Sequence, residues 1–412
     1  MEASGWWPLV TVLMAATPLL AQGDSELTNL GPKDSPPRPA LPCHRISVSN
    51  IDFAFGLYRR LALDAPGENI LFSPASISLA LATVSLGAPA ASRTQLLEGL
   101  GFNLTVMSEA EIQEGFQDLL LRLPTRGSHL LLTTGQRSFR SLGSGTTQKH
   151  IKEYVEEQTQ GRLGAWVEDL REEAAEVLVN HVALRAEWAQ PFDPGATSLK
   201  AFFLDEGRAV QVPMVKQKAS HRFLHDPELQ CTVLQMDHAG NATTFFVFPN
   251  RGKLGQVEEA LLPETLIKWD SLLRTRELDF YFSKFSISST TRLETLLPPV
   301  PVGGGLPGQP GLGISRDHGF AAPVPHHCNP LCQDAGLSLE LAQVTHKATM
   351  TLEEEGSEAA AATSIQLTPR HHPDRAPPTP PATGFSRPFL VMTFHTETGS
   401  VLFLGKVVNP LG

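Results

Sequence analysis

The segment from Glu354 to Arg370 constrains the fold of this 412-residue chain more than any other part of the sequence. Read as an extended strand, it places successive side chains on opposite faces. Glu358, the only charged side chain between residues 357 and 367, lies on the face that water can reach. The other face is uncharged and begins with very small side chains: Ser357, Ala359, Ala361, Thr363, Ile365 and Leu367. A strand of this kind can enter an existing β-sheet and bury its small face.

Two other conformations compete for this segment. Glutamate and alanine favour helices, but Gly356 interrupts a continuous helix and Pro369 prevents its extension. A disordered, alanine-rich linker is the other alternative. The spacing of the small side chains and the hydrophobic sequence that follows both argue against it.

The composition indicates a globular protein and argues against several classes of function. Hydrophobic residues make up 41% of the chain, enough for one large domain or two ordinary ones. The net charge of −10, with no basic face, argues against nucleic-acid binding. Short basic clusters such as Lys216 with Lys218 are typical of solvated surface, so a polyanion cofactor has no support. We find no G-x-S-x-G, H-E-x-x-H or P-loop motif, and therefore expect neither an enzyme nor a bound cofactor.

The N-terminal sequence predicts secretion. Residues 1–21 contain a short apolar stretch ending in small residues, which is typical of a signal peptide and too short to span a membrane. Residues 22–44 are polar and proline-rich and predict a flexible tail. Two Asn-x-Thr triplets, at Asn103 and Asn241, are candidate glycosylation sites of an extracellular protein. Cys231 lies in an apolar alternating run, which predicts a buried thiol.

Periodicity predicts both helices and strands. Residues 51–63 carry apolar side chains at helical spacing, and an apolar, small-residue helix ends near residue 87. Alternation predicts strands over 230–248, and the segment 389–408 reads as two strands joined by a turn near 396–400.

Several ordered motifs along the chain resemble those of the serpin family. They are Phe72 to Gly87, Val179-Asn180 with Trp188, Pro191 and Phe192, Val344 to Ala348, Phe385 to Phe389, and Phe403 to Pro410. The segment 101–105 is similar to the antitrypsin/antichymotrypsin-like branch, clade A. The resemblance implies an α+β serpin domain over 45–412, with a large, mostly antiparallel central sheet surrounded by helices. It also implies a monomer with an exposed reactive-centre loop at about 354–384.

The resemblance assigns roles within this loop. With Gly356 as the fifteenth residue before the cleaved bond, that bond is Arg370–His371, preceded by Pro369. Arginine at this position implies a trypsin-like protease, whose acidic pocket pairs with the guanidinium. In the family, the cleaved loop inserts into the central sheet and drags the ester-linked protease with it. The hinge residues would be Glu354, Gly356, Ser357, Ala359, Ala361 and Thr363.

The same resemblance singles out polar residues elsewhere. Ser76, Asn180 and His346 match the family's shutter beneath the opening sheet, although ordinary buried polar residues are an equal alternative for each one alone. Lys284 and Glu354 match a pair in the breach, where insertion begins; the alternative is a surface ion pair worth at most about 1 kcal/mol.

Three regions depart from the family pattern. After Gln136, about one helix and one edge strand are missing, which could weaken or abolish trapping. Residues 298–334 form a Pro/Gly-rich segment typical of a disordered loop. In that segment His326, His327, Cys328 and Cys332 suggest a metal site, but no second ligand pair flanks them, and we expect no metal. Prolines between residues 373 and 381 predict that the following strand is short or absent.

Three hypotheses for function follow. The first is a secreted inhibitor that traps a trypsin-like serine protease through Arg370. The second is a non-inhibitory serpin that carries a hormone or another extracellular ligand. The third is an inactive relic that folds poorly. The uncharged inward face of the hinge favours the inhibitor.

Overall fold

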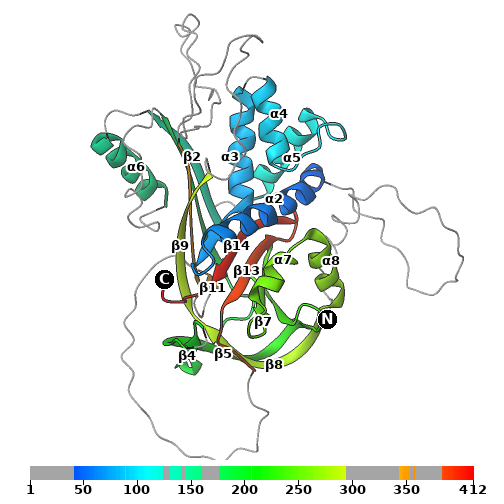
Figure 1. The fold of residues 1–412 in the computed structure, drawn as a ribbon, viewed down its shortest axis with the longest axis vertical. Helices are drawn as coiled ribbons and strands as arrows, with labels where there is room; N and C mark the ends of the chain where they lie inside the picture. Colours follow the sequence, from blue (N-terminus) through cyan, green and yellow to red (C-terminus); the bar gives the residue numbers. More distant parts are fainter. Residues whose placement is uncertain are drawn as a thin grey trace, which may run out of the picture.

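The computed structural model describes residues 41–88, 90–123, 130–140, 144–159, 176–205, 207–293, 343–352, 354, 356–357 and 383–412. Within these residues the longer helices are α2 (Pro42–Asp64), α3 (Pro74–Gly87), α4 (Ala90–Gly99), α5 (Glu109–Arg122) and α6 (Ser144–Thr159). Shorter helices follow: η2 (Pro194–Ala196), α7 (Leu254–Glu259) and α8 (Pro263–Leu272). Helices α2 to α5 gather at one end of the molecule, and α7 and α8 pack beside the sheet strands lower down (Figure 1).

Local sequence explains where these helices begin. Helices α2, α3 and α8 each begin with a proline, whose missing N–H is not needed in the first turn. The hydroxyl of Ser73 caps α3 by accepting a hydrogen bond from the backbone of Ser76. At α5, Ser108 and Glu111 form a reciprocal capping box. Because α2 begins at Pro42 and buries Cys43, the predicted tail ends earlier than residue 44.

Within the described residues, the larger sheet contains nine strands. Their order is β1 (Ile70–Phe72), β14 (Ser400–Val407), β13 (Phe389–His395), β7 (Ala242–Pro249), β6 (Cys231–Asp237), β5 (Ala209–Asp226), β8 (Arg274–Ser283) and β12 (Thr383–Phe385), with β4 (Ser198–Phe203) also paired to β5. The strands predicted over 230–248 and 389–408 are therefore confirmed. In the described part of the chain, the first strand after the proline-rich stretch is β12, which is three residues long.

The second sheet has five strands in the part of the chain that the structure describes. Their order is β2 (Leu130–Arg140), β3 (Glu176–Glu187), β11 (Gly356–Ser357), β10 (Gln343–Leu352) and β9 (Phe285–Arg292). Strand β2 pairs with β3 and is the outermost strand of the described part of this sheet. It is on this side of the sheet that the sequence predicts a missing edge strand. The Pro/Gly-rich segment 298–334 lies outside the described residues.

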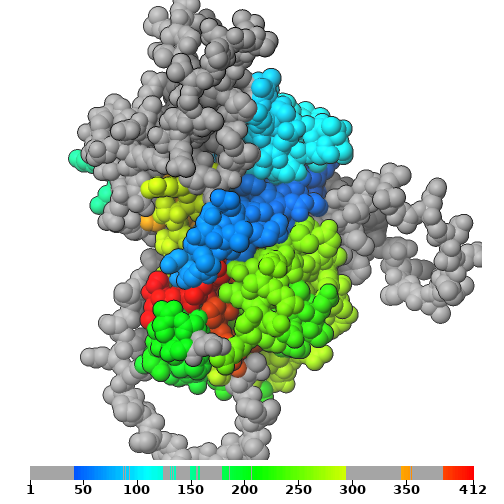
Figure 2. Space-filling model, viewed as in Figure 1, coloured from blue at the N-terminus to red at the C-terminus, as the bar shows by residue number. Residues whose placement is uncertain are grey.

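Aromatic side chains join the elements at the base of the larger sheet. Phe248 and Phe385 stack with their ring centroids 3.9 Å apart, and Phe246 and Phe282 approach to 4.9 Å. All four side chains are buried, and contacts of this kind stabilise more than area burial alone. The space-filling view shows these elements closely packed below the helical end (Figure 2). Among the described residues, no helix is long and apolar enough to cross a membrane.

Candidate functional site

The first residues of the candidate hinge lie within the five-stranded sheet. Gly356 is opposite Glu187, and Ser357 is opposite Ala186, in an antiparallel pairing with β3. Ser357 also pairs antiparallel with Leu352 of β10. The chain therefore reverses direction after β10 and returns as β11 between two strands that run parallel to each other.

Beyond β11 the two neighbouring strands pair directly with each other. The parallel ladder between β3 and β10 runs from Val177–Gln343 to Ala183–Thr349. A strand continuing after Ser357 would have to separate this ladder. It would replace one parallel ladder with two antiparallel ones, which are slightly more stable per residue. The backbone hydrogen bonding of the sheet therefore favours deeper insertion once the strands part.

Glu354, which lies where the chain reverses between β10 and β11, is held by three contacts. Glu354 Oε2 lies 2.7 Å from Lys284 Nζ, and its Oε1 accepts a hydrogen bond of 2.8 Å from the Thr197 hydroxyl. Its backbone carbonyl accepts a 2.8 Å hydrogen bond from the N–H of Phe192. Burial alone would raise the pKa of the Glu354 carboxyl, but the hydrogen bonds from Lys284 and Thr197 outweigh burial, and the pKa lies below its usual value. Glu354 is only 8% exposed, so the pair is not an ordinary surface ion pair.

A buried polar cluster joins α3 to the middle of the same sheet. Asn180 Oδ1 accepts hydrogen bonds from the Ser76 hydroxyl, at 3.1 Å, and from His346 Nδ1, at 2.6 Å. The Ser76 hydroxyl also lies 2.8 Å from that of Thr134 in β2. Asn180 Nδ2 donates a long 3.5 Å bond to the Gly135 carbonyl. The three residues matched to the shutter are thus brought into one network, which spans β2, β3, β10 and α3.

The tautomer of His346 follows from its partners. The backbone N–H of Ser73 donates to His346 Nε2 at 3.0 Å, so this nitrogen carries no proton and Nδ1 donates to Asn180. Burial, reinforced by the neighbouring His181, lowers the pKa of His346 to about 3. The neutral ring therefore holds two strands and a helix cap together. The sequence analysis did not predict that Ser73 and Thr134 belong to this cluster, although Ser73 lies inside the Phe72 to Gly87 motif.

The opposite face of β3 carries a second buried histidine. The ring of His181 packs edge-on against Tyr154 of α6, with centroids 5.6 Å apart. A Cβ atom at Gly135 would lie 2.5 Å from the His181 ring, so only glycine fits at this point of β2. Neither ring nitrogen of His181 has a hydrogen-bond partner among the described residues. Burial lowers the pKa of His181 to about 4.

Near the reversal, two motif residues pack against neighbouring rings. Trp188 stacks on His238 with ring centroids 4.3 Å apart, and Phe192 meets Trp188 edge-on at 6.4 Å. His238 in turn contacts the hydroxyl of Thr244 at 2.9 Å. The Trp-x-x-Pro-Phe motif is therefore connected to Glu354, because the backbone N–H of Phe192 donates to the Glu354 carbonyl.

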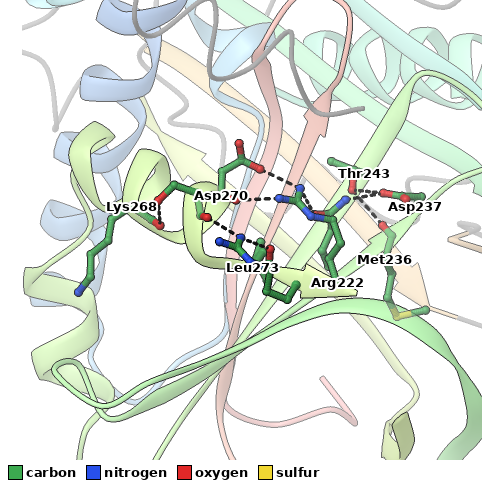
Figure 3. A network of polar contacts seen from close by, with 10 residues as sticks. Arg222, Met236, Asp237, Thr243, Lys268, Asp270 and Leu273 are labelled. Atoms are coloured by element: carbon green, nitrogen blue, oxygen red, sulfur yellow. Dashed lines mark hydrogen bonds and ion pairs between the residues drawn. The ribbon is translucent and has the colours of Figure 1, made fainter. Parts of the chain in front are cut away.

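A third polar network anchors α8 to the larger sheet (Figure 3). Arg222 of β5 donates to the carboxylate of Asp270 at 2.8 Å, to the backbone carbonyl of Asp270 at 2.7 Å, and to Gln235 of β6 at 2.9 Å. Gln235 donates to Asp237, which also accepts from Thr243. Burial raises the pKa of Asp270 although Arg222 opposes the shift. We interpret this network as structural, because Arg222 binds Asp270 of α8 on one side and Gln235 of β6 on the other.

Several predicted residues cannot be compared with the structure. Ala359, Ala361, Thr363, Pro369, Arg370 and His371 lie outside the described residues, as do the histidines and cysteines near residue 330. Both glycosylation candidates, Asn103 and Asn241, are exposed. Cys231 is a buried free thiol, as predicted, and Cys43 is another. The described residues contain no cluster of three or more potential metal ligands.

Comparison with known proteins gives a consistent assignment. The model of the family "Serpin (serine protease inhibitor)" matches residues 48–144 and 141–410. Putative serpin A13 of Homo sapiens is 69% identical over 307 residues, covering 72% of this chain and 100% of that protein. Kallistatin of Homo sapiens is 39% identical over 406 residues, covering 90% of this chain and 88% of kallistatin. The crystal structure of human thyroxine-binding globulin with thyroxine has a TM-score of 0.75 and 35% identity, covering 90% of this chain and 100% of that one.

The chain belongs to the serpin family, and its relatives place it in clade A. The α+β fold expected from the sequence is confirmed by these structural neighbours. The family is one of serine protease inhibitors and not of enzymes, and it also includes carriers such as thyroxine-binding globulin. The family match consists of two segments that overlap at residues 141–144, close to the place where the sequence predicts a missing helix and edge strand.

Proposed function

We propose that this protein is a secreted inhibitor of a trypsin-like serine protease and acts as a suicide substrate cleaved at Arg370–His371. The observation that carries the proposal is the position of β11. Gly356 and Ser357 already pair with β3 and β10, and the residues that follow them in the sequence have one small, uncharged face.

The chemistry requires no catalytic group on the inhibitor. The serine hydroxyl of the protease attacks the carbonyl carbon of Arg370, and the amine of His371 leaves with a proton. Arg370 is then joined to the protease as an ester. The segment that ends at Arg370 is no longer connected to His371 and the rest of the chain. The loop is now free to continue β11 into the sheet, carrying the protease with it.

The driving force lies in the sheet. Each step of insertion breaks part of the β3–β10 ladder and forms pairs on both sides of the incoming strand. The segment from Gly356 to Arg370 spans about 50 Å when fully extended, which is long enough to move the acyl group far from its starting point. Displacement on this scale distorts the protease before water can hydrolyse the ester.

The test is incubation of the purified protein with trypsin or thrombin, followed by denaturing electrophoresis and sequencing of the cleaved product. We expect a covalent complex with a new N-terminus at His371. Arg370→Ala should abolish the complex with these enzymes. Clean cleavage without any complex would overturn the inhibitory proposal.

A matched pair of hinge variants tests insertion separately from recognition. Ala361 belongs to the small face and Ala360 to the opposite face. Ala361→Arg should turn the protein into a substrate, because an unpaired charge would have to be buried during insertion. Ala360→Arg should retain the complex. Equal trapping by both variants would contradict the strand alternation on which the proposal rests.

A second candidate is a carrier of a small extracellular ligand. The similarity in fold and sequence to thyroxine-binding globulin supports it. The division of the family match into two segments near residues 141–144 also supports it, because a sheet without an edge strand would accept the loop less readily. A carrier would be cut at the loop without forming a complex and would gain little stability on cleavage. An inactive relic would show no cooperative unfolding transition at all.

We also propose that residues 1–21 are removed on secretion and that Asn103 and Asn241 are glycosylated in a monomeric extracellular protein. Both asparagines are exposed, which glycan transfer requires. Expression in mammalian cells should release a protein into the medium whose mass falls after amidase treatment. Retention in the cell with an intact N-terminus would overturn this part of the proposal.

A further inference from the structure

A cavity of about 450 Å³ lies away from the five-stranded sheet, where three segments of the chain meet. One wall is the end of β4 and the turn after it, at residues 203–205. The second is the connection between β7 and α7, at 249–254, and the third is Arg387–Pro388 before β13. Strands β4, β5 and β7 lie in the lower part of Figure 1, whereas the shutter cluster adjoins α3 above them. The cavity has a volume typical of small-molecule sites.

The walls are fixed by backbone contacts. The N–H of Phe203 donates to the carbonyl of Ser386 at 2.8 Å, which joins the first wall to the third. The N–H of Asn250 donates to the carbonyl of Gln230 at 2.8 Å and holds the second wall against the end of β6. Gly252 has a φ of 71°, so the turn in this wall requires a conformation that other residues rarely adopt. The cavity is therefore a preformed feature of the fold.

One part of the lining is apolar. Phe203 is 47% exposed, although aromatic rings of this size are usually buried at the ends of strands. Leu254 and Pro388 are only partly covered, and Pro249 is buried behind them. An aromatic or aliphatic group placed here would cover apolar surface that now faces water.

The other part of the lining is cationic. Arg251 and Arg387 both border the cavity, and both are exposed. Among the residues that the structure describes, Arg387 makes no side-chain hydrogen bond or ion pair. The nearby carboxylate of Asp205 is already occupied, because it accepts hydrogen bonds from the backbone of Gly207 and Arg208 and pairs with the Arg208 guanidinium at 2.6 Å. An anion in the cavity would therefore face the guanidinium group of Arg387 without competition from that carboxylate.

We propose that this cavity binds a small amphipathic organic anion, with its carboxylate or sulfonate group at Arg387 and its ring or chain against Phe203 and Leu254. The proposal does not depend on protease inhibition, since none of its residues belongs to the hinge, the shutter or the breach. It assigns the protein a ligand site in addition to the reactive loop.

The experiment is isothermal titration calorimetry of the intact protein with naphthalene-2-sulfonate, compared with the neutral analogue 2-naphthol. We expect one saturable site for the sulfonate, with a dissociation constant below about 1 mM, and much weaker binding of 2-naphthol. Arg387→Gln should weaken sulfonate binding about tenfold, because a charge-assisted hydrogen bond is lost. Arg60→Gln is the matched control, since this exposed arginine of α2 pairs with Asp64 and does not border the cavity.

A second variant keeps the test decisive if Arg387→Gln folds poorly. Phe203→Ala removes the exposed ring and should weaken both the sulfonate and any residual binding of 2-naphthol. Thermal unfolding of each variant identifies loss of structure. The proposal is overturned if the sulfonate fails to bind, if Arg387→Gln and Phe203→Ala bind it as tightly as the parent protein, or if 2-naphthol binds equally well.

Discussion

Lys284 Nζ lies 2.7 Å from Glu354 Oε2, and this contact ties the junction of β8 and β9 to the residue where the chain turns into the hinge. The side chains are 20% and 10% exposed, so the charges are poorly screened by solvent. Because the Thr197 hydroxyl and the Phe192 N–H bind the same residue, Glu354 is fixed from three directions. In the proposed mechanism, insertion of the loop would begin beside a residue that is held by these three contacts.

Lys284→Met should loosen this point. The change leaves the Glu354 carboxylate with only the Thr197 hydroxyl, and we expect the free energy of unfolding to fall by about 1–2 kcal/mol. Spontaneous conversion to a loop-inserted form should also become faster. Denaturant unfolding measures the free energy of unfolding of Lys284→Met and of its control. The control is Lys218→Met, which removes a pair whose side chains are 59% and 67% exposed and should change stability by less than about 0.5 kcal/mol. Equal effects would show that the breach pair has no special role.

His346→Phe tests the shutter cluster. The substitution removes the acceptor for the Ser73 N–H and the donor to Asn180, leaving buried polar groups unsatisfied. We expect a loss of about 2–4 kcal/mol and a faster opening of the β3–β10 ladder, visible as faster hydrogen exchange in those strands. His225→Gln is the control, because this exposed histidine makes only a 3.5 Å contact with Thr232. Unchanged exchange in β3 and β10 would contradict the assigned role.

Acid should destabilise the protein between about pH 6.5 and pH 4. The pKa values of His181, His238 and His395 are lowered to about 4, and that of His346 to about 3, chiefly by burial. In this range the unfolded chain binds protons that the folded protein does not, so the free energy of unfolding decreases as the pH falls. Above the ordinary histidine pKa both states are neutral, and this penalty disappears.

His181→Phe isolates one contribution. Phenylalanine keeps the edge-on contact with Tyr154 but cannot take up a proton. We compare the free energy of unfolding of the variant with that of the parent protein at each pH. The difference should favour the variant by about 1 kcal/mol more at pH 5.5 than at pH 7.5. Denaturant unfolding at the two pH values measures this difference. An identical pH dependence in both proteins would mean that folding does not lower the pKa of His181.

Two glycine-to-alanine substitutions should have opposite effects. A Cβ atom at Gly405 would lie 2.5 Å from the carbonyl oxygen of Ile70, so Gly405→Ala should push β14 from β1 and cost about 1–3 kcal/mol. No atom lies within 4 Å of the corresponding position at Gly56 in helix α2. Gly56→Ala should therefore stabilise the protein by about 0.5–1 kcal/mol. Thermal unfolding checks the signs, and two changes in the same direction would contradict the packing described for β14.

Local patterns predicted the main elements well because their periodicity is strong. The C-terminal pair of strands and the strands over 230–248 alternate clearly. The approach of Lys284 to Glu354 and the joining of Ser76, Asn180 and His346 were anticipated only through the family resemblance. Spacing alone does not bring together residues so far apart along the chain.

Other features could not have been read from the sequence. Thr134 joins the cluster only because β2 pairs with β3 in one particular register, and a shift by one residue would turn its side chain away. Thr197 follows a short 3-10 turn, with no sequence pattern that points to Glu354. The entry of Gly356 and Ser357 into the sheet depends on competition between the strands β3, β10 and β11, which is a property of the whole fold.

The most direct test of the account is thermal unfolding of the protein before and after cleavage at Arg370 by a catalytic amount of trypsin. If the segment after Ser357 completes the strand that β11 begins, the cleaved protein should gain two antiparallel ladders, and its unfolding temperature should rise by more than about 10 °C. An unchanged or lower unfolding temperature, with the cut confirmed between Arg370 and His371, would show that the sheet does not accept the loop and would contradict the central claim.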